Sequence, residues 1–256
     1  MVRVDDGWTQ RLTDDTQILL SEMDPGAHGM RERELLPKLA PQEQARYRAF
    51  GAEARRRSWL AGRELLCAAV ARLLGEVDAG ALLTEDHGGV RYAGGGLHLN
   101  LSHSGGWLAA ACARSPVGVD IEQVRPRAVT AHAERVFCAS EAEALEQDPD
   151  PLTGFYRLWT LKEAACKAAG LTMWDSLQHV CFDLGKGSCR LTPPFPAGLW
   201  HFMHGSFAPG WRLALAQRGS AAAPRIGCWR RNGAGWDSTG LSGLAYLTGG
   251  EAEPLS

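Results

Sequence analysis

The stretch LHLNLSHSGGWLAAACARSPVGVDIE, residues 97–122, decides the fold class. Leu97, Leu99 and Leu101 alternate with polar residues, which is typical of a half-buried β-strand. The run at residues 107–122 predicts a second strand, and Gly105 and Gly106 between the two runs predict a hairpin turn. With helical patterns before and after it, this hairpin favours an α+β fold over a doubly wound parallel sheet.

Helical patterns lie on both sides of this stretch. Residues 54–75 place leucine and alanine on one side of a long helix that ends at Gly75, and residues 151–170 form a second strong helical pattern ending at Gly170. Between them, Ser140 is expected to cap a helix, with Glu143 completing a capping box. Two short helices are expected within residues 31–50, and further strands at residues 16–24, 179–187, 199–205 and 211–217. Residues 218–256 are rich in Gly, Ala and Ser, lack clear periodicity, and are expected to form an irregular tail.

The composition is that of a globular protein and sets limits on its partners. Of the 256 residues 45% are hydrophobic and 22% charged, and the net charge of −2 argues against nucleic acid or an anionic membrane as the main partner. The first twenty residues lack a signal-peptide pattern and no long uncharged apolar stretch follows, so a cytoplasmic location is expected. The seven cysteines are scattered without metal-type spacing, and most are expected to be small buried residues in a reducing compartment.

Two acids, Asp120 and Glu122, interrupt an otherwise apolar strand pattern. Residues i and i+2 of a strand share one face and lie about 6–7 Å apart along it. Two like charges held that close in a buried setting are costly unless a cation or hydrogen-bond donors lie between them. The sequence therefore predicts a positive group in the gap.

The helix at residues 151–170 carries a matching polar face. Trp159, Glu163 and Lys167 are spaced i, i+4, i+8, and Lys162 precedes the glutamate. Taken alone, Glu163 and Lys167 are explained by an exposed ion pair worth about 0.2–0.5 kcal/mol.

A different interpretation follows when the strand and the helix are combined. Glu163 would add a third carboxylate to Asp120 and Glu122, and Mg²⁺ prefers hard oxygen ligands that it shares with phosphate groups. The nearby lysines would neutralise the remaining phosphate charge. Calcium is less favoured, because no EF-hand loop pattern is present.

Four motifs follow one another along the chain in an order that is specific to one family: HLNLSHSGGW, PVGVDIE, FCASEAEAL and LWTLKEAACKAAG. Over about residues 40–185 the chain thereby resembles the 4′-phosphopantetheinyl transferases of the surfactin-synthetase-activating type. The resemblance implies an α+β fold of two similar subdomains related by pseudo-twofold symmetry, residues 1–116 and 117–217, with coenzyme A between them. It also implies Mg²⁺-dependent transfer of the phosphopantetheine arm of coenzyme A to a serine of an acyl or peptidyl carrier protein, releasing adenosine 3′,5′-bisphosphate. A monomer is implied as well.

The resemblance also implies a role for each matching residue. Asp120, Glu122 and Glu163 correspond to metal ligands, and Glu141 corresponds to the general base. Lys162 and Lys167 correspond to residues that contact the pyrophosphate, and Ser102 and His103 to residues that contact the phosphates of coenzyme A. The candidates for binding its 3′-phosphate are Arg46, Arg55 and Arg63. Glu163 and Lys167 would in addition serve catalysis. Two alternatives stay open: an acid in the first turn of a helix, such as Glu141, is favoured by the helix dipole alone, and Arg56 or Arg57 could replace Arg55.

Two positions depart from the family pattern. The lysine of a Gly-Lys-Pro segment before the SHS motif is missing, and Arg91 is the nearest candidate to replace it. Glu43 stands where a lysine is common. Both changes reduce the positive charge expected near the coenzyme.

Two other classes of function fit the same residues. A Mg²⁺-dependent phosphohydrolase would use the acids and lysines with water as the nucleophile. A non-catalytic module would bind coenzyme A or a carrier protein without reaction. The identity of the carrier is not set by these motifs, since it depends on surface complementarity.

Overall fold

The computed structural model describes residues 16–85, 89–93, 96–126, 133, 136–174, 176–219 and 223–250. These residues form two mixed β-sheets with a small number of helices, which confirms the predicted α+β class. The chain divides into two compact units. The first comprises the described residues of Met1–Ser102, Gly106–Arg114 and Pro224–Thr239, and the second those of His103–Gly105, Ser115–Ala223 and Gly240–Ser256.

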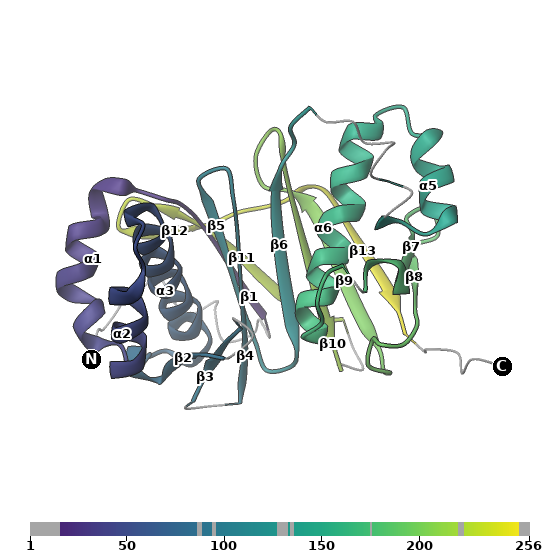
Figure 1. Ribbon diagram of the computed structural model, residues 1–256. Helices are drawn as coiled ribbons and strands as arrows, with labels where there is room; N and C mark the ends of the chain where they lie inside the picture. The colour runs from purple at the N-terminus through teal and green to yellow at the C-terminus, as the bar shows by residue number, and fades with distance from the viewer. Residues whose placement is uncertain are drawn as a thin grey trace. The chain divides into compact units, whose positions relative to one another are not determined.

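The first unit is built on a seven-stranded sheet of order β12-β11-β1-β5-β4-β3-β2 (Figure 1). Its strands are β1 (Thr16–Glu22), β2 (Leu82–Thr84), β3 (Val90–Tyr92), β4 (Leu97–Ser104), β5 (Trp107–Ala113), β11 (Ile226–Asn232) and β12 (Gly235–Ser238). Its helices are α1 (His28–Glu34), α2 (Pro41–Ala49) and α3 (Glu53–Leu74), with short 3-10 turns at Pro25–Ala27, Leu36–Lys38 and Ala79–Ala81.

The second unit is built on a six-stranded sheet of order β6-β10-β9-β13-β8-β7. Its strands are β6 (Val117–Gln123), β7 (Val180–Asp183), β8 (Ser188–Leu191), β9 (Trp200–Ser206), β10 (Trp211–Arg218) and β13 (Ser242–Gly249). Its helices are α5 (Ala139–Glu146) and α6 (Pro151–Ala169), with a 3-10 turn at Leu177–His179. None of the described helices is both long and apolar enough to cross a membrane.

Each unit packs one long helix against its sheet. In the first unit α3 lies against β1 and β5, burying Leu65, Leu66 and Val70, and it ends at Gly75 with φ 85°. In the second unit α6 lies against β6 and β10 and ends at Gly170 with φ 68°. Both helices end where the sequence predicts, because glycine adopts the left-handed conformation without a Cβ clash. Their pseudo-twofold relation stays a prediction.

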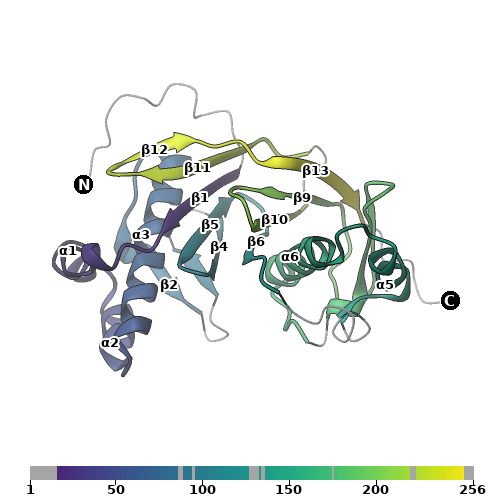
Figure 2. The same ribbon diagram turned by 90° about the horizontal axis from the view of Figure 1, so that it is seen from above.

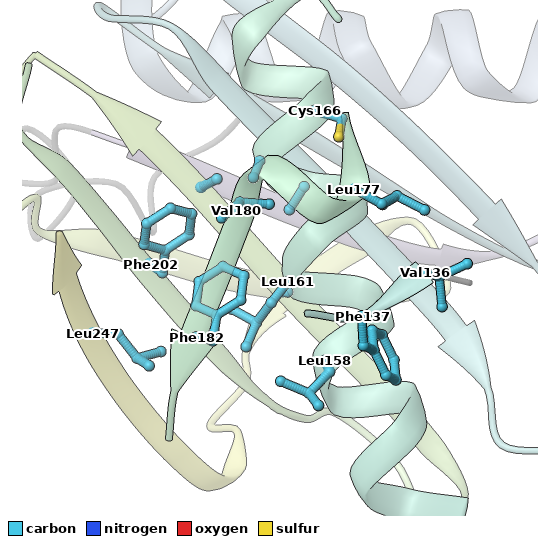
Figure 3. Close-up of a cluster of buried hydrophobic side chains, with 14 of the residues drawn as sticks. Val136, Phe137, Leu158, Leu161, Cys166, Leu177, Val180, Phe182, Phe202 and Leu247 are labelled. Carbon is cyan, nitrogen blue, oxygen red and sulfur yellow. The ribbon is translucent and has the colours of Figure 1, made fainter. Parts of the chain in front are cut away.

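The core of the second unit fixes the position of α6. Figure 3 shows Leu158 and Leu161 of the helix pointing toward Phe182 and Phe202 of the strands. Phe182 and Phe202 meet edge to face with ring centroids 4.9 Å apart. Because these apolar contacts anchor one side of α6, its polar side is held in a defined place over β6.

The backbone of α6 lies very close to β6 at Gly118. A Cβ at this position would lie 2.1 Å from the Ala164 carbonyl oxygen and 2.6 Å from the Ala168 nitrogen, both backbone atoms of the helix. Only glycine allows the strand to run this close to the helix.

We expect Gly118→Ala to destabilise the fold by about 1–3 kcal/mol or more, because neither the strand nor the helix backbone can move away freely. The midpoint of urea unfolding measures the effect. Gly240→Ala is the matched control, since a Cβ there meets nothing within 4 Å. Equal midpoints for the two variants would show that the close approach is not a real constraint.

The run at residues 107–122 forms two strands and not the single strand expected. β5 ends at Ala113 and pairs with β1 in the first sheet, whereas β6 begins at Val117 and pairs with β10 in the second sheet. Pro116 lies at the break, and a proline has no N–H to donate to a sheet ladder. The apolar character of both strands hides this break in the sequence.

The prediction of an irregular tail over residues 218–256 is wrong for most of its described part. β11 pairs in parallel with β1 in the first sheet, and β13 pairs with β9 and β8 in the second (Figure 2). Only one residue of each strand is buried, so they lack the alternation of buried and exposed residues that reveals a strand. The same segment thus contributes to both sheets, and the expected division at residues 116 and 217 does not describe it.

The cap of α5 also differs from the prediction. Cys138 is the N-cap residue, and the capping box joins Cys138 to Glu141 in place of Ser140 to Glu143. Glu143 is exposed. The helix therefore begins at Ala139, two residues earlier than a Ser140 cap would place its start, and Glu141 is buried.

Candidate metal and phosphate site

The three acids predicted to converge do so in the structure. Asp120 and Glu122 lie on β6 and Glu163 lies on α6, with one carboxylate oxygen of each within 4.8 Å of the others. Asp120 is buried, while Glu122 and Glu163 are half-buried. The period-2 geometry of β6 explains the arrangement, since Gly118, Asp120 and Glu122 share the face that α6 covers.

Lys167 supplies the positive group within this cluster. Its Nζ lies 2.6 Å from Asp120 Oδ1 and 3.6 Å from Glu163 Oε2, and it donates to the Val119 carbonyl oxygen at 3.3 Å. Burial acts to lower the pKa of Lys167, but the charges of Asp120 and Glu163 outweigh it and raise the pKa above its ordinary value. Lys167 is therefore a fixed cation.

One ammonium does not balance three carboxylates. Burial, followed by the charge of Asp120, raises the pKa of Glu163 to about 7. Burial also raises the pKa of Glu122, against the opposing effect of a hydrogen bond from Ser104. A site of three hard oxygen donors with unbalanced negative charge fits a divalent cation such as Mg²⁺.

Two further residues complete the cluster and were not among the predicted site residues. The Ser104 hydroxyl donates to Glu122 Oε2 at 2.8 Å and accepts from the Gln123 N–H at 3.3 Å. The Trp159 indole, which can only donate, is hydrogen-bonded to Glu122. Sequence spacing pointed to Trp159, since it lies one turn before Glu163, but its partner on another element could not be inferred. Both contacts orient the Glu122 carboxylate.

Lys162 and Glu141 do not join this cluster. The Lys162 ammonium has no solvent exposure, lies 2.7 Å from Glu141 Oε2 and donates to the carbonyl oxygens of Leu177 and Val180. Lys162 is thus paired inside the protein, and its predicted contact with a pyrophosphate stays a prediction. The side chain ties α6 to the segment that leads into β7.

Glu141 has its carboxylate oxygens engaged as well. Oε2 accepts from the Cys138 N–H at 3.0 Å and Oε1 from the Phe182 N–H at 2.7 Å. Burial raises the pKa of Glu141 to about 7, against the opposing charge of Lys162. The residue borders a cavity of about 330 Å³ lined by α5, α6 and β7, yet only 1% of it is exposed. These contacts give Glu141 a structural role, and its predicted role as general base stays a prediction.

The SHS motif places its residues on alternate faces of β4. Ser102 is buried and His103 is exposed. Their contacts with coenzyme A phosphates stay predictions.

The predicted 3′-phosphate arginines separate into two kinds. Arg46 on α2 and Arg55 on α3 are exposed, and the Arg55 guanidinium lies over the Phe50 ring at 4.7 Å. Arg63 is 3% exposed, and its guanidinium donates twice to Glu43 Oε2, at 3.1 and 2.9 Å. The charge of Arg63 is thus paired inside the protein, and its predicted contact with a phosphate stays a prediction.

The ion pair between Arg63 and Glu43 explains why Glu43 stands where the family commonly has a lysine. Glu43 is 1% exposed and also accepts from the backbone N–H and the hydroxyl of Thr84. It joins α2, α3 and β2, so it is a structural residue and does not reduce the surface charge as the sequence suggested.

Comparison with known proteins places the chain in a family. Residues 116–216, which include all three acids and Lys167, match the family model of the 4′-phosphopantetheinyl transferase superfamily. The chain is 34% identical over 191 residues to the 4′-phosphopantetheinyl transferase HetI of Nostoc sp., a match that covers 71% of this chain and 74% of that protein. It is 34% identical over 132 residues to 4′-phosphopantetheinyl transferase psf-1 of Bacillus pumilus, a match that covers 50% of this chain and 56% of that protein. It is 40% identical over 75 residues to 4′-phosphopantetheinyl transferase Sfp of Bacillus subtilis, a match that covers 28% of this chain and 33% of that protein.

The chain belongs to the 4′-phosphopantetheinyl transferase superfamily, which confirms the predicted resemblance. The matched region spans about half of the psf-1 protein and about a third of the Sfp protein.

Proposed function

We propose that this chain transfers the 4′-phosphopantetheine arm of coenzyme A to a serine of an apo acyl or peptidyl carrier protein in a Mg²⁺-dependent reaction. The observation that carries the proposal is the convergence of Asp120, Glu122 and Glu163 on one point beside Lys167. The family membership supports the reaction type, and the relatives' names support it further.

The residues of the cluster would have separate roles that suit phosphoryl transfer. Asp120, Glu122 and Glu163 would hold the Mg²⁺ ion, which when bound neutralises charge on the pyrophosphate oxygens. Lys167, held as a cation by two of these acids, would face the remaining phosphate charge. Ser104 and Trp159 keep Glu122 oriented before any ligand arrives.

The test is the intact mass of an apo carrier protein after incubation with the chain, coenzyme A and Mg²⁺. We expect the carrier to gain the mass of one phosphopantetheine group and adenosine 3′,5′-bisphosphate to appear, with both products lost when EDTA removes the metal. Release of the bisphosphate without carrier modification would indicate a hydrolase. Binding of coenzyme A with no reaction at all would indicate a non-catalytic module, and either result contradicts the proposal.

We also expect the chain to act as a monomer, as its resemblance to the surfactin-synthetase-activating type implies. Light scattering of the purified protein checks this expectation.

A further inference from the structure

Two cysteines meet in the second unit, away from the acid cluster. Cys138 is the N-cap of α5, and Cys181 lies on β7. Their sulfur atoms and a Glu141 carboxylate oxygen all lie within 4.8 Å of one another, and the two thiols are hydrogen-bonded to each other. Both cysteines are half-buried, whereas Cys67, Cys112 and Cys166 are buried. This pair is thus both close together and reachable from solvent.

The surroundings of Cys138 favour the thiolate. Its sulfur accepts the N–H of Glu141 in the capping box and lies 3.4 Å from the Ser140 hydroxyl oxygen. The hydrogen bond from Cys181, followed in strength by that from Ser140, lowers the pKa of Cys138 to about 4. Cys138 is therefore the member of the pair that more readily carries the thiolate.

The surroundings of Cys181 favour the thiol. The shared proton raises its pKa, because Cys181 donates to the Cys138 sulfur. Other charged groups face the pair from three elements: Glu141 on α5, Lys162 on α6 through its ion pair with Glu141, and Arg190 on β8, whose Nη2 lies 3.8 Å from the Cys181 sulfur. A thiolate beside a thiol is the arrangement used by dithiols that exchange with disulfides.

We propose that Cys138 and Cys181 form a thiol–disulfide exchange site for small-molecule disulfides such as oxidised glutathione. The Cys138 thiolate attacks one sulfur of the reagent, forming a mixed disulfide and expelling one glutathione thiolate. Cys181, losing its proton to that thiolate or to water, then attacks the Cys138 sulfur and expels the second glutathione. Starting from the Cys138 thiolate and the Cys181 thiol, the protein loses one proton and two electrons. One oxidised glutathione becomes two reduced ones, released as one thiol and one thiolate that takes its proton from water.

The product would be a disulfide that joins the start of α5 to β7. These elements also meet through the Glu141 hydrogen bond to the Phe182 N–H, directly after Cys181. The proposal does not depend on the transferase function, since it involves none of the residues of the acid cluster.

The experiment treats the full-length chain with oxidised glutathione at pH 7 and maps its disulfides by mass spectrometry of non-reduced peptides. We expect a Cys138–Cys181 disulfide. Cys181→Ser is expected to stop at a mixed disulfide between Cys138 and glutathione, whereas Cys138→Ser is expected to leave Cys181 unmodified. Cys189→Ser is the matched control, since Cys189 is a half-buried cysteine on the neighbouring strand β8, and it should react as the wild type does.

A second readout does not rely on oxidation. Iodoacetamide at pH 6 should alkylate Cys138 at least about tenfold faster than Cys189, because only a thiol with a low pKa is ionised there. The burial of Cys189 raises its pKa to about 12. A disulfide that joins other cysteines, no disulfide at all, or equal alkylation of Cys138 and Cys189 at pH 6 would each overturn the proposal.

Discussion

Replacing Glu163 by glutamine is expected to lower the rate of carrier modification by about 100-fold or more while the fold is retained. The substitution keeps the size of the side chain but removes one of the three carboxylates that converge beside Lys167. Loss of a metal ligand removes several kcal/mol of charge stabilisation in the transition state, and each 1.36 kcal/mol changes the rate tenfold. The initial rate of phosphopantetheine transfer at saturating Mg²⁺ measures the effect, and circular dichroism checks the fold.

Glu143→Gln provides the matched control for this loss. Glu143 is an exposed acid on α5 and takes part in no capping box, so the same change of charge should leave the rate unaltered. If Glu163→Gln modified the carrier at the wild-type rate, the assignment of Glu163 as a metal ligand would be wrong.

Replacing Lys162 by methionine is expected to lower the free energy of unfolding by about 3–5 kcal/mol. The substitution leaves Glu141 buried without its ionic partner and removes the donor to the Leu177 and Val180 carbonyl oxygens. An unpaired buried charge and unsatisfied acceptors are both costly. Urea unfolding of wild type and variant measures the change.

Two further variants separate this buried pair from an ordinary ion pair. Lys186→Met breaks an exposed pair with Asp183, in which the lysine side chain is 80% exposed, and no measurable change is expected. The double variant Lys162→Met, Glu141→Leu should recover much of the lost stability, because both buried charges are then absent. Unfolding midpoints of Lys162→Met that match those of Lys186→Met would contradict a structural role for Lys162.

The features that the sequence predicts well are those with a local cause. Helix ends at Gly75 and Gly170 follow from a single residue type that tolerates positive φ. The shared face of Asp120 and Glu122 follows from strand geometry alone. The convergence of Glu163 with them could be predicted only by combining two separate motifs, because no local pattern relates a strand to a helix forty residues away.

The features that the sequence misses depend on partners far along the chain. The sequence did not indicate that Lys162 and Arg63 pair with the buried acids Glu141 and Glu43. The sequence around a lysine or arginine in a motif does not indicate whether its charge pairs with a ligand or with another part of the protein.

The missed strands have the same kind of cause. β11 and β13 are held by pairing with β1 and β9, about two hundred and about forty residues earlier in the chain. Few of their own residues are buried and they show little alternation, so the evidence for these strands lies in the strands that they pair with.

The most direct test of the account is whether the three acids bind a divalent cation together. Mn²⁺ is a suitable paramagnetic substitute for Mg²⁺, because both prefer octahedral oxygen coordination. Electron paramagnetic resonance of Mn²⁺ titrated into the protein with coenzyme A present would count the bound ions. The account predicts a single tight site that is lost or strongly weakened in Asp120→Asn, Glu122→Gln and Glu163→Gln alike. Unchanged Mn²⁺ binding in all three variants would contradict it.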